Sequence, residues 1–139
     1  MIALPEEIAQ KVRQWVAYAE EDLLLARHGL TLHERAPLRL VAYHAQQCAE
    51  KYLKGFLVWK GIDFPYTHNI AYLLELVATQ VSWADNLIDA AALTPFAITT
   101  RYPGEDAKVE WEEAEQAIAT AERVRKVVRQ ALVIENLIL

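Results

Sequence analysis

The chain has 139 residues, of which 54% are hydrophobic and 24% are charged. This composition predicts one globular domain over residues 1–139 and excludes a disordered or fibrous protein. The formal net charge of −5 at pH 7 excludes a general attraction to nucleic acid, so any contact with RNA needs a local basic patch.

The first predicted helix starts at Pro5, because proline suits the first turn of a helix, and it stops near residue 28, before Gly29. Its apolar residues recur every three or four positions, which is the period of a helix with one buried face. The residues of this stripe are Ile8, Val12, Trp15, Ala19, Leu23 and Ala26. After a short connection, Pro37 can open a second helix that ends at residue 59 or 60, before Gly61.

Two further helices are predicted in the middle of the chain. Thr67 or Asn69 can cap a third helix that ends at residue 77 or 78. Ser82 or Asp85 can cap a fourth helix. Pro95 must break or kink this fourth helix, because proline lacks a backbone N–H and its ring clashes with the preceding turn.

Thr94 can cap a short additional turn, and residues 101–107, RYPGEDA, form a clear break with Pro103 and Gly104 adjacent. A long last helix is predicted from about residue 109 into the 130s. The predicted fold class is all-α, an antiparallel up-and-down helical bundle of four long helices plus a short extra helix. The residues expected to be mostly buried in it are Trp15, Cys48, Tyr52, Phe56, Ile118 and Val128.

The cellular location is inferred from three features of the sequence. One cysteine cannot form an internal disulfide, which fits a reducing compartment. The first ten residues, MIALPEEIAQ, lack the basic region and the long apolar run of a signal peptide. No stretch approaches the roughly 18 apolar residues that a membrane-spanning helix needs. We therefore expect a soluble, cytoplasmic protein without a membrane segment.

The stretch at residues 44–55, HAQQCAEKYLKG, places polar side chains along one edge of the second helix. His44, Gln47, Lys51 and Lys54 are three, four and three residues apart, so they form a row beside the apolar face. Ammonium groups can contact phosphate, and an amide can read a base or ribose edge. The row is therefore a candidate site for a phosphate-bearing ligand or for an acidic partner surface.

A purely structural interpretation of the row stays open, because lysine and glutamine often cover the rim of a core with their aliphatic stems. Lys51 can also pair with a carboxylate of a neighbouring helix. Gln46 and Glu50 are expected further round the helix, where Glu50 and Lys54 form a surface ion pair. His68 is expected to cap a helix or to tie down a loop.

Four segments in chain order resemble the HEPN domain family, and together they span roughly residues 11 to 128. They are WVAYAEEDLLLA at residues 15–26, HAQQCAEKYLKG at 44–55, THNIAYLLEL at 67–76 and TTRYPG at 99–104. The resemblance implies a small helical bundle that is commonly dimeric. It also implies a two-component, toxin–antitoxin-like system, because many family members are encoded beside a minimal nucleotidyltransferase. Several branches of the family are metal-independent RNases with an Arg-x4–6-His motif.

The spacing of that RNase motif is matched by Arg39 with His44 and by Arg27 with His33. In the RNase branches the motif lies late in the chain, whereas here no histidine follows His68. RNA cleavage needs a group that activates the 2′-hydroxyl and an acid for the leaving oxygen, and histidine does both well near pH 7. Catalytic activity is therefore left open, with a metal-independent RNase as one alternative and a non-catalytic dimerisation module as another.

No metal and no cofactor are predicted. His44 and Cys48 are one turn apart, but two ligands do not complete a metal site and a free cysteine is commonly a core residue. The sequence also lacks the Glu-x-x-His spacing of a di-iron bundle and a Gly-rich phosphate loop.

The residues and the resemblance together predict a helical subunit of a two-component system with a nucleotidyltransferase. It would engage nucleotide, RNA or that partner through the polar helix edge, helped by Arg101, whose guanidinium can grip a phosphate with two hydrogen bonds. The candidate ligand- or partner-binding residues are His44, Gln47, Lys51, Lys54, Arg101 and Tyr102. Four tryptophans and the apolar tail ALVIENLIL exceed what one small bundle needs to bury, so a symmetric homodimer is predicted as well.

Overall fold

The computed structural model describes residues 4–97 and 108–139. Its elements are α1 (Pro5–Leu30), the 3-10 turn η1 (His33–Arg35), α2 (Leu38–Trp59), α3 (Ile70–Ala78), the 3-10 segment η2 (Trp83–Ala97) and α4 (Trp111–Ile134). No strand occurs within the two described ranges, and the all-α fold class is confirmed. None of the helices in these ranges has the apolar length that crossing a membrane requires.

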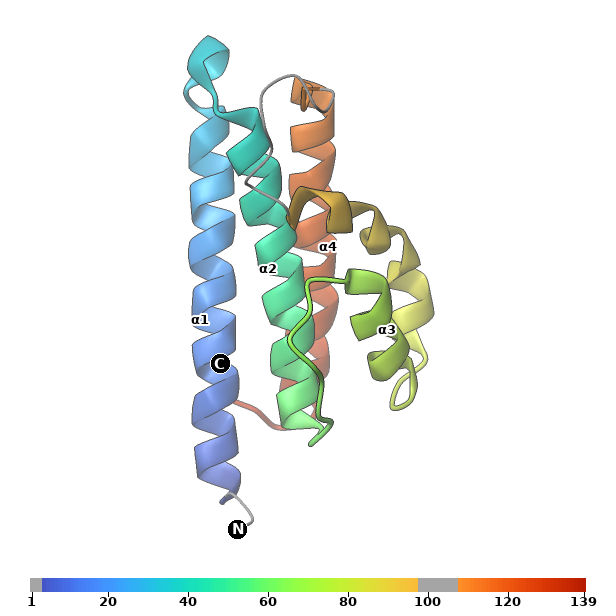
Figure 1. Cartoon of the computed structure of the whole chain (residues 1–139). Helices are drawn as coiled ribbons and strands as arrows, with labels where there is room; N and C mark the ends of the chain where they lie inside the picture. Colours follow the sequence, from blue (N-terminus) through green and yellow to red (C-terminus); the bar gives the residue numbers. More distant parts are fainter. Residues whose placement is uncertain (1–3, 98–107) are drawn as a thin grey trace.

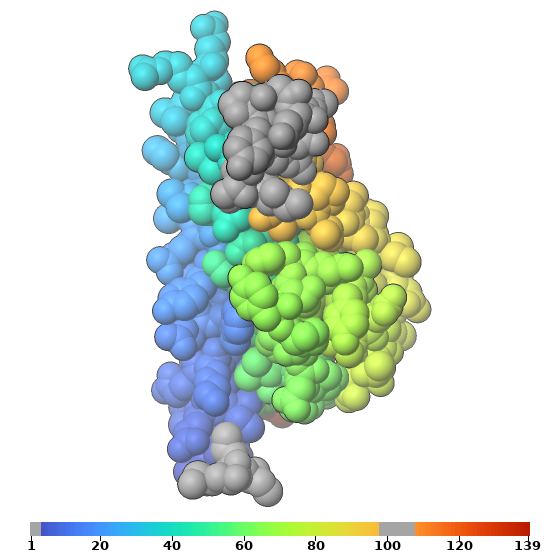
Figure 2. Space-filling model, viewed as in Figure 1, coloured from blue at the N-terminus to red at the C-terminus, as the bar shows by residue number. Residues whose placement is uncertain are grey.

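Three long helices lie side by side and form the body of the molecule (Figure 1). α1, α2 and α4 contain 26, 22 and 24 residues. α2 packs against both of the others and runs antiparallel to α1 and parallel to α4 (Figure 1). The nine-residue α3 and η2 take the places of the third and fourth predicted helices. They pack together on the flank of α2 that faces away from α1, as Figure 2 shows in green and yellow.

η2 continues through Pro95, which corrects the prediction that this proline breaks or kinks the helix. The φ of proline, about −65°, falls within the range of a 3-10 helix, so the ring is tolerated there. Thr94 has a different role from the predicted cap, because its Oγ1 accepts the backbone N–H of Ile70 at 3.1 Å and joins η2 to α3. Asn69 caps α3 as predicted, with its Oδ1 accepting the N–H of Tyr72 at 3.1 Å.

α2 is enclosed by its neighbours along most of its length. Every residue from Ala45 to Leu57 is buried except Lys51, and α1, α3, η2 and α4 all contact this helix. Buried polar groups need partners inside the protein, so each polar residue of α2 must find one there. Of the predicted core residues only Trp15 is half-buried, and the others are buried: Cys48, Tyr52, Phe56, Ile118 and Val128.

Gly29 allows α1 and α2 to approach each other closely. A Cβ atom at this position would lie 2.5 Å from Cγ2 of Val41 on α2, a distance that no side chain tolerates without a shift. α1 continues past this glycine to Leu30, so Gly29 does not stop the helix where the sequence predicted. Its role is to remove the side chain at a helix–helix contact.

α2 and α4 end with the same backbone turn. Gly61, with a φ of 70°, follows α2, and its N–H and that of the next residue donate to carbonyls of the last turn at 3.1 and 2.9 Å. This is a Schellman motif, which favours glycine or asparagine in the left-handed position. Asn136, also at a φ of 70°, repeats the motif after α4. Lys60 Nζ donates to Glu135 Oε1 at 2.6 Å and links the two helix ends.

Glu20 ties α1 to α4. Arg125 donates three hydrogen bonds to its carboxylate, at 2.8 to 3.1 Å. These bonds from Arg125 hold the pKa of the Glu20 carboxyl below its ordinary value of 4.5. On the next turn of α4, Arg129 Nη1 donates to the hydroxyl of Tyr52 at 3.3 Å, and burial raises the pKa of that phenol. α1, α2 and α4 therefore share one set of polar contacts.

We expect Glu20→Gln to lower the free energy of unfolding at neutral pH. We also expect the free energy of unfolding of this variant to fall less on acidification than that of wild type. A carboxyl with a lowered folded-state pKa stabilises the fold above pH 4.5, and this contribution disappears as the pH falls through the folded-state pKa. Urea denaturation over a pH series measures both effects. Glu122→Gln is the control, because its pair with Arg27 is exposed. Equal acid sensitivity of Glu20→Gln and wild type would contradict the prediction.

Candidate functional site

Asp22 on α1 holds two members of the predicted row. Lys51 Nζ donates to Asp22 Oδ2 at 2.5 Å, and His44 Nδ1 lies 2.8 Å from Asp22 Oδ1. Asp22 is buried, and a buried carboxylate needs such partners because it has lost its water. His44 and Lys51 therefore bridge α2 to α1, which is the structural interpretation that the sequence left open for Lys51.

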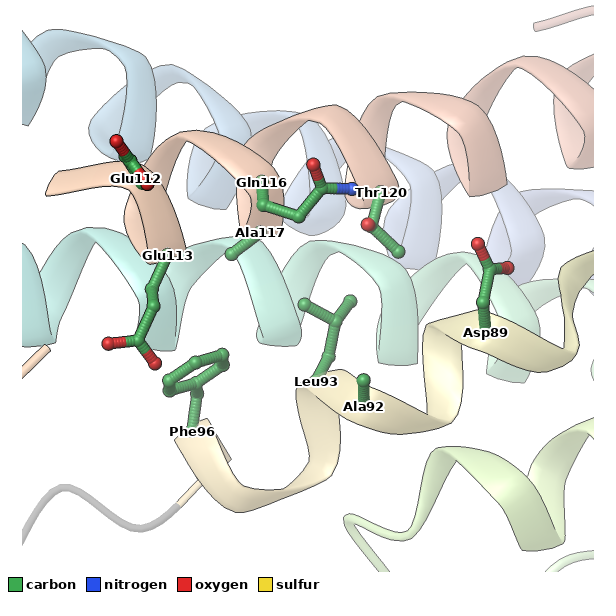
Figure 3. Close-up of a pocket in the computed structure, with 9 residues that line it drawn as sticks. All are labelled: Asp89, Ala92, Leu93, Phe96, Glu112, Glu113, Gln116, Ala117 and Thr120. Carbon is green, nitrogen blue, oxygen red and sulfur yellow. The ribbon is translucent and has the colours of Figure 1, made fainter. Parts of the chain in front are cut away.

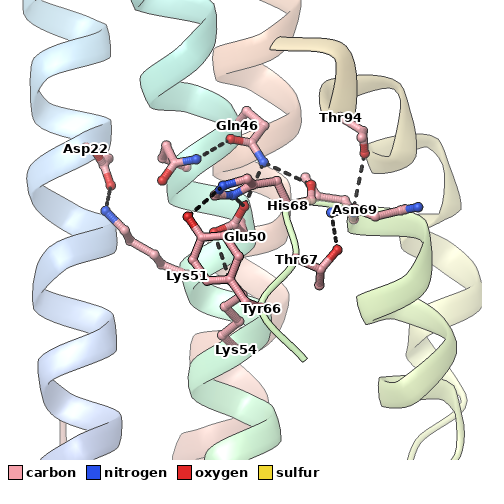
Figure 4. Close-up of polar contacts among 12 residues, drawn as sticks. Asp22, Gln46, Glu50, Lys51, Lys54, Tyr66, Thr67, His68, Asn69 and Thr94 are labelled. Carbon is pink, nitrogen blue, oxygen red and sulfur yellow. Dashed lines mark hydrogen bonds and ion pairs between the residues drawn. The ribbon is translucent and has the colours of Figure 1, made fainter. Parts of the chain in front are cut away.

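A second polar cluster lies inside the molecule, on the side of α2 that faces the loop before α3 (Figure 4). Gln47 Nε2 donates to Gln46 Oε1 at 2.7 Å, and Gln46 Nε2 donates to Glu50 Oε1 at 3.1 Å and to the backbone oxygen of His68 at 3.4 Å. All three α2 side chains belong to buried residues. Figure 4 shows how the cluster connects α2 to the loop that precedes α3.

The expected surface pair between Glu50 and Lys54 is buried instead. Lys54 Nζ lies 3.1 Å from Glu50 Oε2, and only 6% and 4% of the two side chains are exposed. The ammonium also lies 5.8 to 5.9 Å from the ring centroids of Trp15, Phe64 and Tyr66, within reach of a cation–π attraction. The prediction was wrong because the loop before α3 covers this side of α2.

The cluster reaches the surface through His68 and Tyr66. His68 Nδ1 lies 2.7 Å from Glu50 Oε1, and His68 Nε2 lies 3.3 Å from the hydroxyl of Tyr66. The two rings meet edge to face with centroids 5.3 Å apart. The His68 side chain is 40% exposed and Tyr66 is 88% exposed. A hydrogen-bonded chain therefore runs from a buried carboxylate to a phenol in solvent.

The carboxylate of Glu50 determines how His68 can act. An ionised carboxylate only accepts hydrogen bonds, so Nδ1 of His68 carries the hydrogen and donates it. In the neutral ring, Nε2 is then the acceptor and receives the hydroxyl of Tyr66. A carboxylate that orients an imidazole, which in turn contacts a hydroxyl, is the arrangement of many acid–base sites. The position of His68 also confirms that it ties down a loop.

The structure thus divides the predicted site residues. Gln47 and Lys54 belong to the Glu50 cluster, whereas His44 and Lys51 contact Asp22. Arg101 and Tyr102 lie outside the described residues. Sequence reasoning did not include Asp22, Gln46, Glu50, Tyr66 or His68 in the site. The adjacent pair of glutamines followed by a glutamate one turn later was a signal that could have indicated the buried cluster.

Cys48 belongs to the buried core of the bundle. It is fully buried, and burial raises the pKa of its thiol, so the reactive thiolate is scarce. Over the described residues, no group of three or more His, Cys, Asp and Glu side chains is arranged to hold a metal ion.

Comparisons with known proteins identify relatives of the whole bundle. The family model for the HEPN domain matches residues 12–131. The crystal structure of TT1696 from Thermus thermophilus is similar, with 28% identity and a TM-score of 0.70 over 86% of this chain and 97% of that chain. ST0689, described as an archaeal HEPN homologue, has 28% identity and a TM-score of 0.69 over 87% and 97% of the two chains. The comparison with curated proteins gave no match.

A double-mutant cycle on Glu50→Leu and Lys54→Met should show strong coupling. Each single variant leaves a buried charge without its partner, and we expect each to lower the free energy of unfolding by about 3 kcal/mol. The double variant should lose less than the sum, because neither charge is then stranded. Urea denaturation measures all four proteins.

The control cycle uses the exposed pair Arg27 and Glu122, whose side chains are 50% and 44% exposed. Its coupling should stay within about 1 kcal/mol. Additive losses in the Glu50 and Lys54 cycle would contradict the prediction.

Proposed function

The chain belongs to the HEPN domain family, and on this premise we propose that it is the helical subunit of a two-component system. Its partner is a separately encoded minimal nucleotidyltransferase, and the Tyr66–His68 pair is a principal contact for that partner. The observation that supports this proposal is the 88% exposure of Tyr66. Its hydroxyl contacts His68, which in turn is held by the buried carboxylate of Glu50. An exposed tyrosine with fixed neighbours offers a large contact area at a low cost in conformational entropy.

The charges around α2 favour a protein partner over a phosphate-bearing ligand. Lys51 is paired with Asp22, and Lys54 is paired with Glu50. A phosphate that bound either ammonium would have to displace a buried or nearly buried carboxylate and leave it unpaired, which is costly. A phenol and an imidazole at the surface are free of this penalty, and such residues are common in protein interfaces.

The predicted site residues have two different roles in this proposal. The row on α2 fixes the helix beneath the contact surface and consists of His44, Gln47, Lys51 and Lys54. Arg101 and Tyr102, which lie outside the described residues, are retained as proposed contacts with the partner or with its nucleotide.

RNA cleavage is a second candidate function, and the hydrogen bonds of His68 favour it. An imidazole that a buried carboxylate orients can take the proton of a ribose 2′-hydroxyl, and the phenol of Tyr66 can supply a proton to the leaving oxygen. Incubation of RNA with wild type and with His68→Ala tests this role. Cleavage by the wild type alone would support it, and intact RNA with the wild type would exclude it.

We further propose a symmetric homodimer that uses the end of α4 and the tail. Ile134 and Ile138 are 79% and 78% exposed, and Val133 is 59% exposed. A cavity of about 490 Å³ lies beside Ile134 and is partly lined by Trp83. Clustered apolar side chains on a surface are typical of protein interfaces, and two-fold dimers are the commonest closed assembly.

We expect Tyr66→Ala to weaken binding of the neighbouring nucleotidyltransferase by about tenfold or more, because a central interface tyrosine contributes roughly 2 kcal/mol. Titration calorimetry with the purified partner measures the affinity. Tyr72→Ala is the matched control, because Tyr72 is also exposed, at 40%, and lies on α3. Unchanged affinity of Tyr66→Ala would refute the contact. A wild type that does not bind the partner, or a gene without such a neighbour, would refute the two-component proposal.

We expect the variant Ile134→Glu/Ile138→Glu to be a monomer, because four buried carboxylates would face each other across a two-fold interface. Light scattering at micromolar concentration should give 15.8 kDa for this variant and twice that mass for wild type. Ile88→Glu is the control, since Ile88 is 72% exposed on η2, outside the tail. A wild-type mass of 15.8 kDa would contradict the dimer.

A further inference from the structure

A groove of about 320 Å³ lies on one face of α1 and is lined by Lys11, Gln14, Trp15 and Tyr18. These residues share a face because their spacing matches one and two turns of a helix. Three of them are exposed and Trp15 is half-buried, so the groove is open to a partner. Its volume lies within the range of binding pockets.

Trp15 joins this groove to Tyr66 through a group of aromatic rings. Trp15 meets Phe64 edge to face, with ring centroids 6.3 Å apart. The ammonium of Lys54 lies 5.8 to 5.9 Å from the centroids of these two rings and of Tyr66. Figure 1 shows the loop at residues 61–69, which carries Phe64 and Tyr66, running across α2. One aromatic surface therefore extends from α1 to the exposed Tyr66.

The groove offers more hydrogen-bond donors than acceptors. Gln14 Nε2 donates to the hydroxyl of Tyr18 at 3.3 Å, so this phenol keeps its own hydrogen for a ligand. The indole N–H of Trp15 makes no hydrogen bond with another described residue, and no buried side-chain nitrogen among these residues lacks a partner, so this N–H is open to solvent. Lys11 adds an ammonium group that forms no ion pair within residues 4–97 and 108–139.

We propose that this aromatic surface binds a proline-rich segment of the partner in the polyproline II conformation, an inference that rests on the proposed role of Tyr66 as a partner contact. Such a segment presents free backbone carbonyls and few N–H groups, because it has no internal hydrogen bonds and proline lacks the N–H. Its carbonyls accept from Trp15 and Tyr18, and its proline rings pack on the aromatic faces. Aromatic-lined grooves are the usual receptors of proline-rich segments.

Other occupants match these donors less well. A helix already uses its carbonyls in internal hydrogen bonds, and an added β-strand needs a sheet edge, whereas the described residues form no strand. Single-stranded RNA needs a positively charged groove as well as rings. Lys51 and Lys54 are each paired with a carboxylate, and the formal net charge is −5, so the chain favours an uncharged segment over RNA.

The cavity between η2 and α4 has the opposite chemistry (Figure 3). Asp89 and Glu113 are among its lining residues, and Phe96 is its aromatic side chain. Ionised carboxylates cannot donate hydrogen bonds to the carbonyls of a proline-rich segment. We therefore expect one binding site per chain, on α1.

Titration calorimetry on the full chain tests the proposal with a peptide of about ten prolines and with a peptide of equal length in which glycine replaces every second proline. The all-proline peptide should bind about fivefold more tightly or better, because the glycine-containing peptide has the same carbonyls but must lose more conformational entropy. Equal affinities, or no binding of the all-proline peptide, would overturn the inference.

Two further titrations separate this inference from its alternatives. An oligouridine RNA of the same length should bind more weakly than the all-proline peptide, and tighter binding of the RNA would show that the rings stack bases and would overturn the inference. The nucleotidyltransferase is titrated separately. If it binds wild type while the all-proline peptide does not, the inference fails and the proposed function stands.

Tyr18→Phe keeps the ring and removes the hydroxyl, so it should weaken binding of the all-proline peptide about threefold through the loss of one hydrogen bond. Tyr66→Ala should weaken binding about tenfold, because an exposed ring is lost. Tyr72→Phe and Tyr72→Ala are the matched controls on α3, outside the aromatic surface, and should leave the affinity within about twofold of wild type. Circular dichroism checks that each variant is folded. Wild-type affinity in both Tyr18→Phe and Tyr66→Ala, or equal losses in the controls, would overturn the inference.

Discussion

The carboxylate of Glu50 is the group on which the arrangement around α2 depends. It is buried in the middle of an enclosed helix, where an ion without partners would cost several kcal/mol. Lys54 supplies the opposite charge, Gln46 an amide N–H and His68 a ring nitrogen. Because His68 belongs to the loop between α2 and α3, the same contacts that satisfy Glu50 also place the start of α3.

Several basic side chains around α2 are paired within the chain and are therefore not available for binding at the surface. Lys51, Lys54 and Arg125 each face a carboxylate of their own chain. Within residues 4–97 and 108–139, the surface includes the aromatic side chain of Tyr66, apolar side chains at the tail and carboxylates between η2 and α4.

Local signals predicted those parts of the fold that depend on local structure. The helical period, Gly61 as the end of α2 and Asn69 as the cap of α3 each concern one turn of chain. Glu50 shows what the helical period cannot predict. The period correctly placed Glu50 outside the apolar face of α2, but it does not tell how many neighbouring elements cover a helix, so the burial of Glu50 was not predicted. The pairing of Lys51 with Asp22 depends on the axial offset of α1 and α2, and Tyr66 meets His68 through the path of a loop. Neither is a periodic property of the sequence.

The parallel course of α2 and α4 has an electrostatic consequence. Each helix carries a macrodipole with its negative pole at the C-terminal end, so two adjacent helices that point the same way repel. Glu112 and Glu113 counter the positive pole of α4, whereas the bridge from Lys60 to Glu135 adds no net charge at the paired negative poles, because it brings a cation and an anion together. α1 points the other way and cancels the moment of one helix. The three long helices together therefore keep a net axial moment of about one long helix, and such a moment orients a molecule in an external electric field.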